Sequence, residues 1–525
     1  MSQSLPPKPS LVHLRKQAKD LLAALKSGDP ETAKTFALYF PTTDNIGLIQ
    51  AQLVLAREYG FDSWAVLKRH VTDGNHPTPE SFIDAAKAGR VDDAKAMWLS
   101  NKAELRKDPV VAAMAGDVDA IREYVRLHPT SLRDNFPPKI EPLLVYACTS
   151  RLVADAEFEA GIVGVTDFLL KSGANPDAFT PAEWGGEQWH ESALYGAAGV
   201  LNHAGLTKLL LDAGADPNDN SIEDGVYRGE SLYHACDHPG RNECLRLILE
   251  ANPAQVAADY CIKRKLDFED IEGLRLFLDH GANPNANKPR TALSHAILRG
   301  RSLETLQILL DAGADPNQPD LDGATPYVLA RRLANKEASA LVEAHGAVQE
   351  FTPYDAILIA AADGDEEGVQ QLAKEHPEVV ASFTEIGRQE DDGMALGSAG
   401  QILLDLARLG HAKSLEALLD LGMSPGLKNQ YNETALHWAC VAGRAEAARL
   451  LVSRGAPLDI REKGHNCVPI QWAYWGSEYW NEPFGDYAAT VAAVLDGGMA
   501  LPDKLQGSKA VQDVLRSRGC PEGNP

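Results

Sequence analysis

The sequence predicts an all-α solenoid, in which helix–turn–helix repeats stack side by side. One phrase returns along the chain, for example as LLLDAGADPN at 209–218 and as LLDAGADPN at 309–317. Its glycine recurs at Gly173, Gly214, Gly281, Gly313, Gly346, Gly422, Gly455 and Gly498. Steps of 32 and 33 residues give the unit, and steps of 67 and 76 residues are double ones with insertions. A fixed period of this length indicates a stacked array, so we expect function on an extended surface and in the insertions.

Each repeat is predicted to contain two helices. Leu306, Leu309 and Leu310 place apolar side chains on one face of a helix. Gly313 follows at the point where a helix end needs a left-handed residue, and the Asp-Pro-Asn after it prevents continuation of the helix. A second phrase, TALSHA at 291–296, opens another helix, with Thr291 as its N-cap and small alanines that allow close approach of the neighbouring helix.

The best-preserved unit runs over 432–460 and reads NETALHWACVAGRAEAARLLVSRGAPLDI. Thr-x-Leu-His-x-Ala with a period of 33 residues resembles the ankyrin-repeat family, and the resemblance covers roughly 78–501. It implies an ankyrin-repeat solenoid of about eleven or twelve repeats, several of them degenerate. The repeat over 259–279 has lost its opening phrase.

The first segment, 1–77, carries no such phrase and is predicted to be a helical module that caps the array. Its string AREYGFDSWAVLKRHV at 56–71 resembles a module that precedes ankyrin arrays in uncharacterised bacterial proteins, which implies a bacterial origin but no activity. The array is predicted to occupy 78–500, with insertions near 178–192 and 474–487. Residues 501–525 are predicted to form a C-terminal cap and tail.

The formal net charge of −24 argues against a nucleic-acid partner, because a phosphate backbone attracts a basic surface. The one basic run that stands out, Lys263-Arg-Lys, lies beside Asp267, Glu269 and Asp270. No apolar stretch approaches the roughly 20 residues that cross a bilayer, and the N-terminus has no signal-like apolar core. The seven cysteines form no disulfide framework, so we expect a reduced, cytoplasmic protein that acts away from membranes.

Phosphate-binding loops, dinucleotide-binding glycines and metalloprotease or hydrolase strings do not occur in the sequence. We therefore predict neither a cofactor nor a metal site. This also weighs against an enzyme without deciding the question.

The two insertions are unusually aromatic. The ring-bearing and polar side chains that they carry are Trp184, Trp189, His190, Trp475, Tyr479, Trp480 and Asp486. A loop is normally polar, so these rings must either pack onto the array or form a contact surface. Both interpretations stay open at this point: a small local core, or a site for a planar or sugar-like ligand or a protein partner.

A second set of candidates lies at equivalent positions of the opening phrase. His437 occupies the histidine position, and the position after it holds His234, His295, Trp438 and Trp472. Equivalent side chains of stacked helices lie roughly 10 Å apart, so these four are predicted to line one side of the array. For His437 the alternative is a structural role, because a buried polar ring usually bonds to nearby backbone.

Two functions follow from these observations. The first is a non-catalytic scaffold that presents a concave ankyrin surface to a protein partner. The alternative is a small-molecule or glycan pocket built by the tryptophan-rich insertions, with acid–base catalysis as one version of it. Its candidate catalytic residues are Asp405, His190, His437 and Asp486, since a carboxylate near a histidine can act as acid or base.

Overall fold

The computed structural model describes residues 11–522 except 38, 41–45, 60, 62, 65–66, 69–76, 185–186, 220–221, 224–225, 228, 287–289, 321–322, 387–397, 481 and 483. Its contacts divide the chain into two compact units. Unit 1 contains residues 1–180 with 212–214, and unit 2 contains residues 181–211 with 215–524. The predicted boundaries at 77 and 501 stay predictions.

Unit 1 begins with three helices, α1 (Leu11–Lys26), α2 (Pro30–Ala37) and α3 (Leu48–Glu58), which bury Leu14, Ala18 and Phe36 among others. Helix pairs follow. They are α5 (Pro79–Ala88) with α6 (Val91–Leu105), α7 (Pro109–Met114) with α8 (Val118–Leu127), and α9 (Leu143–Cys148) with α10 (Ala156–Lys171). The short 3₁₀ helices η1 (Ser131–Arg133) and η2 (Arg151–Ala154) lie between them.

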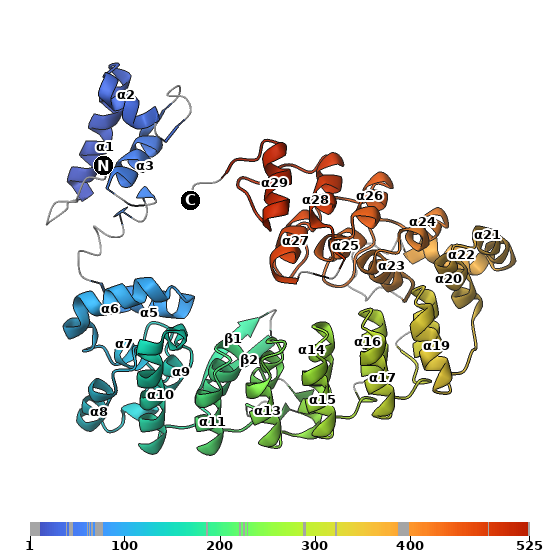
Figure 1. Cartoon of the computed structure of the whole chain (residues 1–525), viewed down its shortest axis with the longest axis horizontal. Helices are drawn as coiled ribbons and strands as arrows, with labels where there is room; N and C mark the ends of the chain where they lie inside the picture. Colours follow the sequence, from blue (N-terminus) through green and yellow to red (C-terminus); the bar gives the residue numbers. More distant parts are fainter. Residues whose placement is uncertain are drawn as a thin grey trace. The chain divides into compact units, whose positions relative to one another are not determined.

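Unit 2 continues the helix pairs, and Figure 1 shows them in chain order. They are η3 (Tyr195–Val200) with α11 (Ala204–Asp212), α12 (Ser231–Ala235) with α13 (Glu243–Glu250), α14 (Gln255–Asp267) with α15 (Ile271–Asp279), α16 (Ala292–Leu298) with α17 (Leu303–Asp311), α18 (Pro326–Arg332) with α19 (Lys336–Ala344), α20 (Pro353–Asp363) with α21 (Glu366–Glu375), α23 (Ser398–Leu409) with α24 (Ala412–Asp420), α25 (Ala435–Val441) with α26 (Ala445–Ser453), and α27 (Pro469–Trp475) with α28 (Tyr487–Asp496). The remaining helices are α22 (Pro377–Ile386), η4 (Gly476–Trp480) and α29 (Lys509–Ser517). Across the described residues of both units the pairs number twelve, and the predicted all-α solenoid is confirmed.

The predicted helix ends are also confirmed. Gly214 and Gly313 have φ of +92° and +86°, the left-handed conformation that favours glycine. Thr291 and Thr434 cap their helices by accepting hydrogen bonds from the backbone N–H groups of Ser294 and His437.

Asparagine side chains join the turns of neighbouring repeats. Asn285 donates from Nδ2 to the carbonyl oxygen of Gly313 over 2.8 Å and accepts at Oδ1 from the backbone N–H of Asp315 over 2.7 Å. Asn317 repeats the pattern one unit later, with Gly346 and Val348. We call this arrangement the turn ladder. It satisfies backbone groups left over at each helix end, and it fixes the stacking of adjacent repeats.

The first insertion differs from the predicted loop. The strands β1 (Phe179–Trp184) and β2 (Glu187–Ser192) form a two-stranded sheet, and after α11 the strand β3 (Ile222–Glu223) pairs with β4 (Val226–Tyr227). Threonine and aromatic residues in the segment favour extended backbone, which explains the strands. In the second insertion η4, a turn of π-helix, continues directly from α27.

The first helices of the repeats in unit 2 form an inner row. In Figure 1 the inner row contains α14 and α16 on one side and α23 and α25 on the other, and the chain turns back between them through α19–α22. The buried Arg408 at the end of α23 donates to the carbonyl oxygens of Leu298 and Arg299, at the end of α16. The inner row therefore brings together repeats that are not neighbours in the chain.

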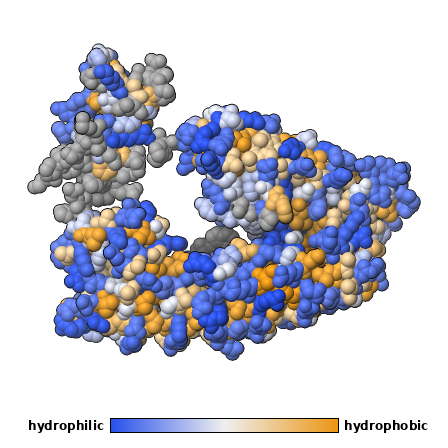
Figure 2. Space-filling model, viewed as in Figure 1, coloured by the Kyte–Doolittle hydropathy of each residue, from blue (hydrophilic) through white to orange (hydrophobic). Residues whose placement is uncertain are grey.

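The face seen in Figure 2 is mainly hydrophilic, with hydrophobic surface in separate patches between the polar side chains. No described helix is long and apolar enough to span a bilayer.

Candidate binding face

A chain of hydrogen-bonded, mostly charged side chains runs along the inner row of unit 2. We call it the inner network, and its members are Glu230, His234, Asp237, Arg264, Asp267, His295 and Arg299. They come from the inner helices α12, α14 and α16 or from the residues that flank them. His234 and His295, predicted to line one side of the array, are linked through this network.

His234 lies between two carboxylates. Its Nε2 is 2.6 Å from Oε2 of Glu230, and its Nδ1 is 2.7 Å from Oδ2 of Asp237. Burial disfavours the charged ring, but the hydrogen bonds and charges of Asp237 and Glu230 outweigh it and raise the pKa of His234 to about 9. The ring is therefore an imidazolium at neutral pH, with both nitrogens donating.

Arg264 connects the two histidines. Its Nε is 2.7 Å from Oδ1 of Asp237, and its Nη1 is 3.2 Å from Oδ2 of Asp267. The guanidinium also lies over the rings of Tyr233 and Phe268, at 5.1 Å and 4.8 Å from their centroids. Cation–π contacts of this kind fix the arginine plane and keep its bonds to the carboxylates oriented.

His295 is neutral at pH 7, whereas His234 is charged. Its Nε2 is 3.0 Å from Oδ1 of Asp267, and Nε of Arg299 is 2.8 Å from the same oxygen. Burial lowers the pKa of His295 to about 4, and the nearby Arg299 adds to that effect against the pull of Asp267. His295 is thus a neutral ring that donates its Nε2 proton to Asp267. That hydrogen bond and the charges of Arg299 and Arg264 hold the pKa of Asp267 well below its usual range despite burial.

Arg299 carries the network to the tryptophans of later repeats. Its guanidinium carbon lies 5.9 Å from the ring centroids of both Trp438 and Trp480. Trp438 packs edge-on against Trp472 with centroids 5.6 Å apart, and Trp472 packs against His437 at 5.2 Å. Aromatic and charged side chains from α25, α27, η4 and the end of α16 therefore meet at this point.

Beside it lies an arginine cluster, which we define as Arg301, Arg408 and Arg444 around Glu482. The closest nitrogens of the three arginines are 3.6, 3.8 and 3.9 Å from the Glu482 carboxylate. Each arginine also donates to a backbone carbonyl: Arg301 and Arg408 to Arg299, and Arg444 to Arg408. Glu482 belongs to the second insertion and accepts a hydrogen bond from Nε1 of Trp480 over 3.1 Å. The cluster therefore attaches the second insertion to the ends of α16, α23 and α25.

The remaining predicted residues lie around this centre in different roles. His437 is fully buried. Its Nδ1 accepts a hydrogen bond from the backbone N–H of Thr434, and its Nε2 is hydrogen-bonded to the carbonyl oxygen of Cys467. Asp405 lies on α23, where burial raises its pKa and Arg408, Arg290 and Arg299 oppose the shift. Asp486 is exposed and caps α28 by accepting from the backbone N–H of Ala489.

The aromatic residues of the two insertions also differ in their surroundings. The side chains of Trp184 and Trp189 lie outside the described residues, and His190 is half-buried on β2. In the second insertion Trp475 stands edge-on to Trp480 at 5.8 Å and packs against Tyr479 at 5.9 Å. Trp480 donates to Glu482 and lies against the guanidinium of Arg299, whereas the side chains of Trp475 and Tyr479 are exposed.

Sequence reasoning did not single out Arg264, Arg299, Arg408 or Glu482. The basic run at 263–265 beside Asp267 was the available signal for the first of these. The others are isolated charges, and nothing local marks them.

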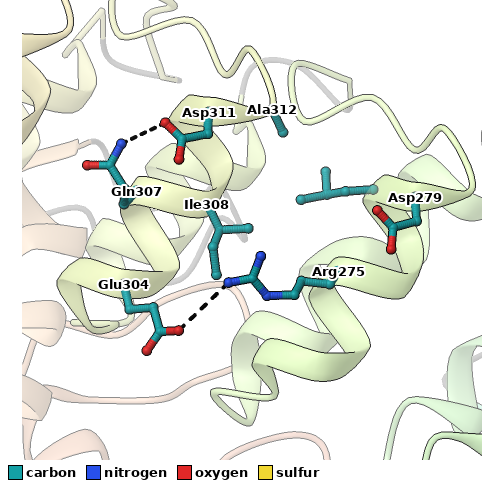
Figure 3. Close-up of a pocket in the computed structure, with 8 residues that line it drawn as sticks. Arg275, Asp279, Glu304, Gln307, Ile308, Asp311 and Ala312 are labelled. Atoms are coloured by element: carbon teal, nitrogen blue, oxygen red, sulfur yellow. Dashed lines mark hydrogen bonds and ion pairs between the residues drawn. The ribbon is translucent and has the colours of Figure 1, made fainter.

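A groove of about 330 Å³ lies elsewhere, between the outer helices α15 and α17 (Figure 3). Arg275 reaches across it towards Glu304 over 3.8 Å, and Gln307 donates to Asp311 on the same helix. Because the ion pair is exposed and the groove follows the junction of two adjacent repeats, we interpret it as an ordinary furrow of the stack. Among the described residues, no three His, Cys, Asp or Glu side chains are grouped to hold a metal ion.

Comparison with known families agrees with this architecture. The family described as "Ankyrin repeats (3 copies)" matches residues 357–463, and the family described as "Ankyrin repeat" matches residues 290–321. This chain is an ankyrin-repeat protein.

Among solved structures, the crystal structure of the human ASB11 ankyrin repeat domain is similar to this ankyrin-repeat protein at 18% identity. The match covers 46% of this chain and 98% of that one, with a TM-score of 0.21, so it supports no conclusion about the whole array. No curated protein matches the chain.

Proposed function

We propose that this ankyrin-repeat protein is a non-catalytic scaffold that binds a protein partner on the inner row of unit 2. Ankyrin repeats are generally protein–protein interaction modules, and a stacked array offers an extended surface for that purpose. The observation that carries the proposal is the inner network, whose side chains link successive repeats, together with the aromatic rings that Arg264 and Arg299 contact.

Partial exposure supports this assignment. His234, Asp237 and Arg264 are each about a quarter to a third exposed, and Tyr260, which packs against Tyr233 at 6.1 Å, is 42% exposed. Tyrosine and arginine, as at Tyr260 and Arg264, are enriched among the residues that dominate binding energy at protein interfaces. The net charge of −24 weighs against nucleic acid as the partner.

The pocket alternative receives less support. Trp480 is engaged by Glu482 and Arg299 within the protein, and the groove between α15 and α17 is lined by none of the candidate catalytic residues. A cytoplasmic location is part of the proposal, because all seven cysteines are free thiols and disulfides are rare in a reducing compartment.

Site-specific photo-crosslinking tests the scaffold. A benzophenone amino acid replaces Tyr260 on inner helix α14 in one variant and Arg275 on outer helix α15 in the matched control, since both side chains are exposed. In a lysate of the native cells we expect a discrete adduct from position 260 and none from position 275. Adducts from position 275 alone, or the same adducts from both positions, would reject the inner row as the binding face.

A further inference from the structure

The second insertion exposes a set of aromatic side chains that the fold does not require. Phe484 is 98% exposed, Tyr479 is 70% exposed and Trp475 is 48% exposed. Single exposed apolar residues are normal on a protein surface, but several large rings on one short segment indicate an interaction site. We call these three residues the aromatic patch.

Phe484 has a second unusual property. Its φ is +65°, a left-handed conformation that costs a bulky residue free energy and that glycine or asparagine adopts more readily. The side chain gains almost no burial within the chain that would offset this cost. Neither packing nor backbone preference therefore explains phenylalanine at this position, and such outliers cluster at ligand-binding segments.

The insertion is held firmly at its base. Gly476 and Gly485 lie so close to the carbonyl oxygens of Val441 and Ala442 that a β-carbon would clash there. The N–H of Asp486 donates to the carbonyl oxygen of Gly443 over 2.8 Å, and the hydroxyl of Tyr487 donates to that of Val441 over 3.0 Å. With Trp480 fixed by Glu482, described residues on both sides of the aromatic patch are held in place, which lowers the entropy lost on binding.

The segment that carries the aromatic patch is acidic, since residues 474–487 include Glu478, Glu482 and Asp486 and no basic side chain. No lysine or arginine occurs in residues 464–503, whereas Glu478 and Asp486 are exposed on the same segment. The arginines beneath it are engaged: Arg299 pairs with Asp267, and Arg301, Arg408 and Arg444 surround Glu482. Exposed rings with carboxylates beside them attract cations, because the ring face and the carboxylate both stabilise a positive charge.

We propose that the aromatic patch, with Glu478 and Asp486, docks a lysine- or arginine-bearing segment of the partner protein. The inference rests on the proposed scaffold function and identifies the chemistry of its partner. A second copy of this chain fits less well, because two acidic segments repel each other, and an anionic lipid surface is disfavoured for the same reason.

The test is binding of a labelled peptide rich in arginine and lysine, measured by fluorescence anisotropy against a twin peptide with glutamate at those positions. The key variant is Phe484→Gly, since glycine suits the backbone and removes only an exposed ring. The matched control is Leu99→Ser, which removes an exposed apolar side chain of unit 1. All measurements use the full chain at physiological salt, because an acidic protein attracts basic peptides non-specifically at low salt.

We expect the basic peptide to bind the wild type, the acidic twin not to bind, and Phe484→Gly to weaken binding by roughly tenfold or more, as truncation of a hot-spot residue does. Leu99→Ser should bind like the wild type.

Equal binding by wild type and Phe484→Gly would overturn the proposal, and so would self-association of the wild type that Phe484→Gly abolishes. A crosslink from position 260 with no peptide effect would reject the aromatic patch alone. A peptide effect with no crosslink at 260 would reject the inner row instead.

Discussion

Two kinds of contact hold unit 2 together, and they differ in how far apart in the chain their partners lie. The turn ladder joins each repeat to the next one, as Asn285 does with Gly313 and Asp315. The arginine cluster joins repeats that are not neighbours, and the hydrogen bond from Arg408 to the Leu298 carbonyl spans 110 residues. Stacked arrays are normally quasi-one-dimensional, with contacts only between adjacent repeats. The arginine cluster shows that this array departs from that description where α16 meets α23.

The difference has an energetic consequence. A ladder contact can break at one turn while the rest of the stack remains, because its partners are local. The arginine cluster links segments on both sides of the turn through α19–α22, so losing it affects several repeats at once. The same contacts place Arg299 against Trp438 and Trp480, and the inner network reaches the later repeats only because the inner row closes on itself.

The largest expected effect comes from Arg408→Ala. Arg408 is buried, and its loss leaves the carbonyls of Leu298 and Arg299 and the carboxylate of Glu482 without this donor. We expect the free energy of unfolding, from urea denaturation, to fall by about 3 kcal/mol. Arg454→Ala is the control, since Arg454 pairs with exposed Glu416 and Asp420 on outer helix α24 and should cost less than about 1 kcal/mol. Equal losses in the two variants would remove the distinction between the two kinds of contact.

A smaller change in the free energy of unfolding is expected from the titration of His234. The pKa of His234 is raised above the unfolded value, so its contribution is complete below about pH 6.5 and is lost as the pH rises through about 9. Allowing for its partial exposure, we expect the wild type to lose about 1–2 kcal/mol across that interval and His234→Gln to lose correspondingly less. Urea titrations at a series of pH values measure this, with the exposed His280→Gln as control. Parallel curves for the wild type and His234→Gln would contradict the double carboxylate pairing.

The smallest effect is expected for the turn ladder. Asn285→Ala removes two hydrogen bonds at a partly exposed turn, and we expect a loss of about 1 kcal/mol in the free energy of unfolding. Hydrogen exchange should show faster exchange at the turns around 283–286 and 313–317, with the distant repeats unchanged. Faster exchange throughout unit 2 would show that the ladder is not a local contact.

The sequence predicts the two kinds of contact unequally. Glycine spacing and capping threonines are local signals, so the helix pairs, their ends and the positions of His234 and His295 follow from the repeat phrase. The link between these histidines does not, because Arg264 and Asp267 lie in the repeat that has lost its opening phrase. The arginine cluster depends on curvature that accumulates from small rotations between successive repeats, and no single repeat encodes it. The strands at 179–192 were missed because a polar, aromatic insertion is equally compatible with a loop.

A distance across the inner row tests its closure most directly. Pulsed electron paramagnetic resonance reports this distance between spin labels at Glu304→Cys on α17 and Glu446→Cys on α26. The half-buried Cys467 is changed to serine in the same chain. We predict a single narrow distance distribution that broadens when Arg408→Ala is added. A broad distribution in the starting protein, or a narrow one unchanged by Arg408→Ala, would contradict an inner row closed by the arginine cluster.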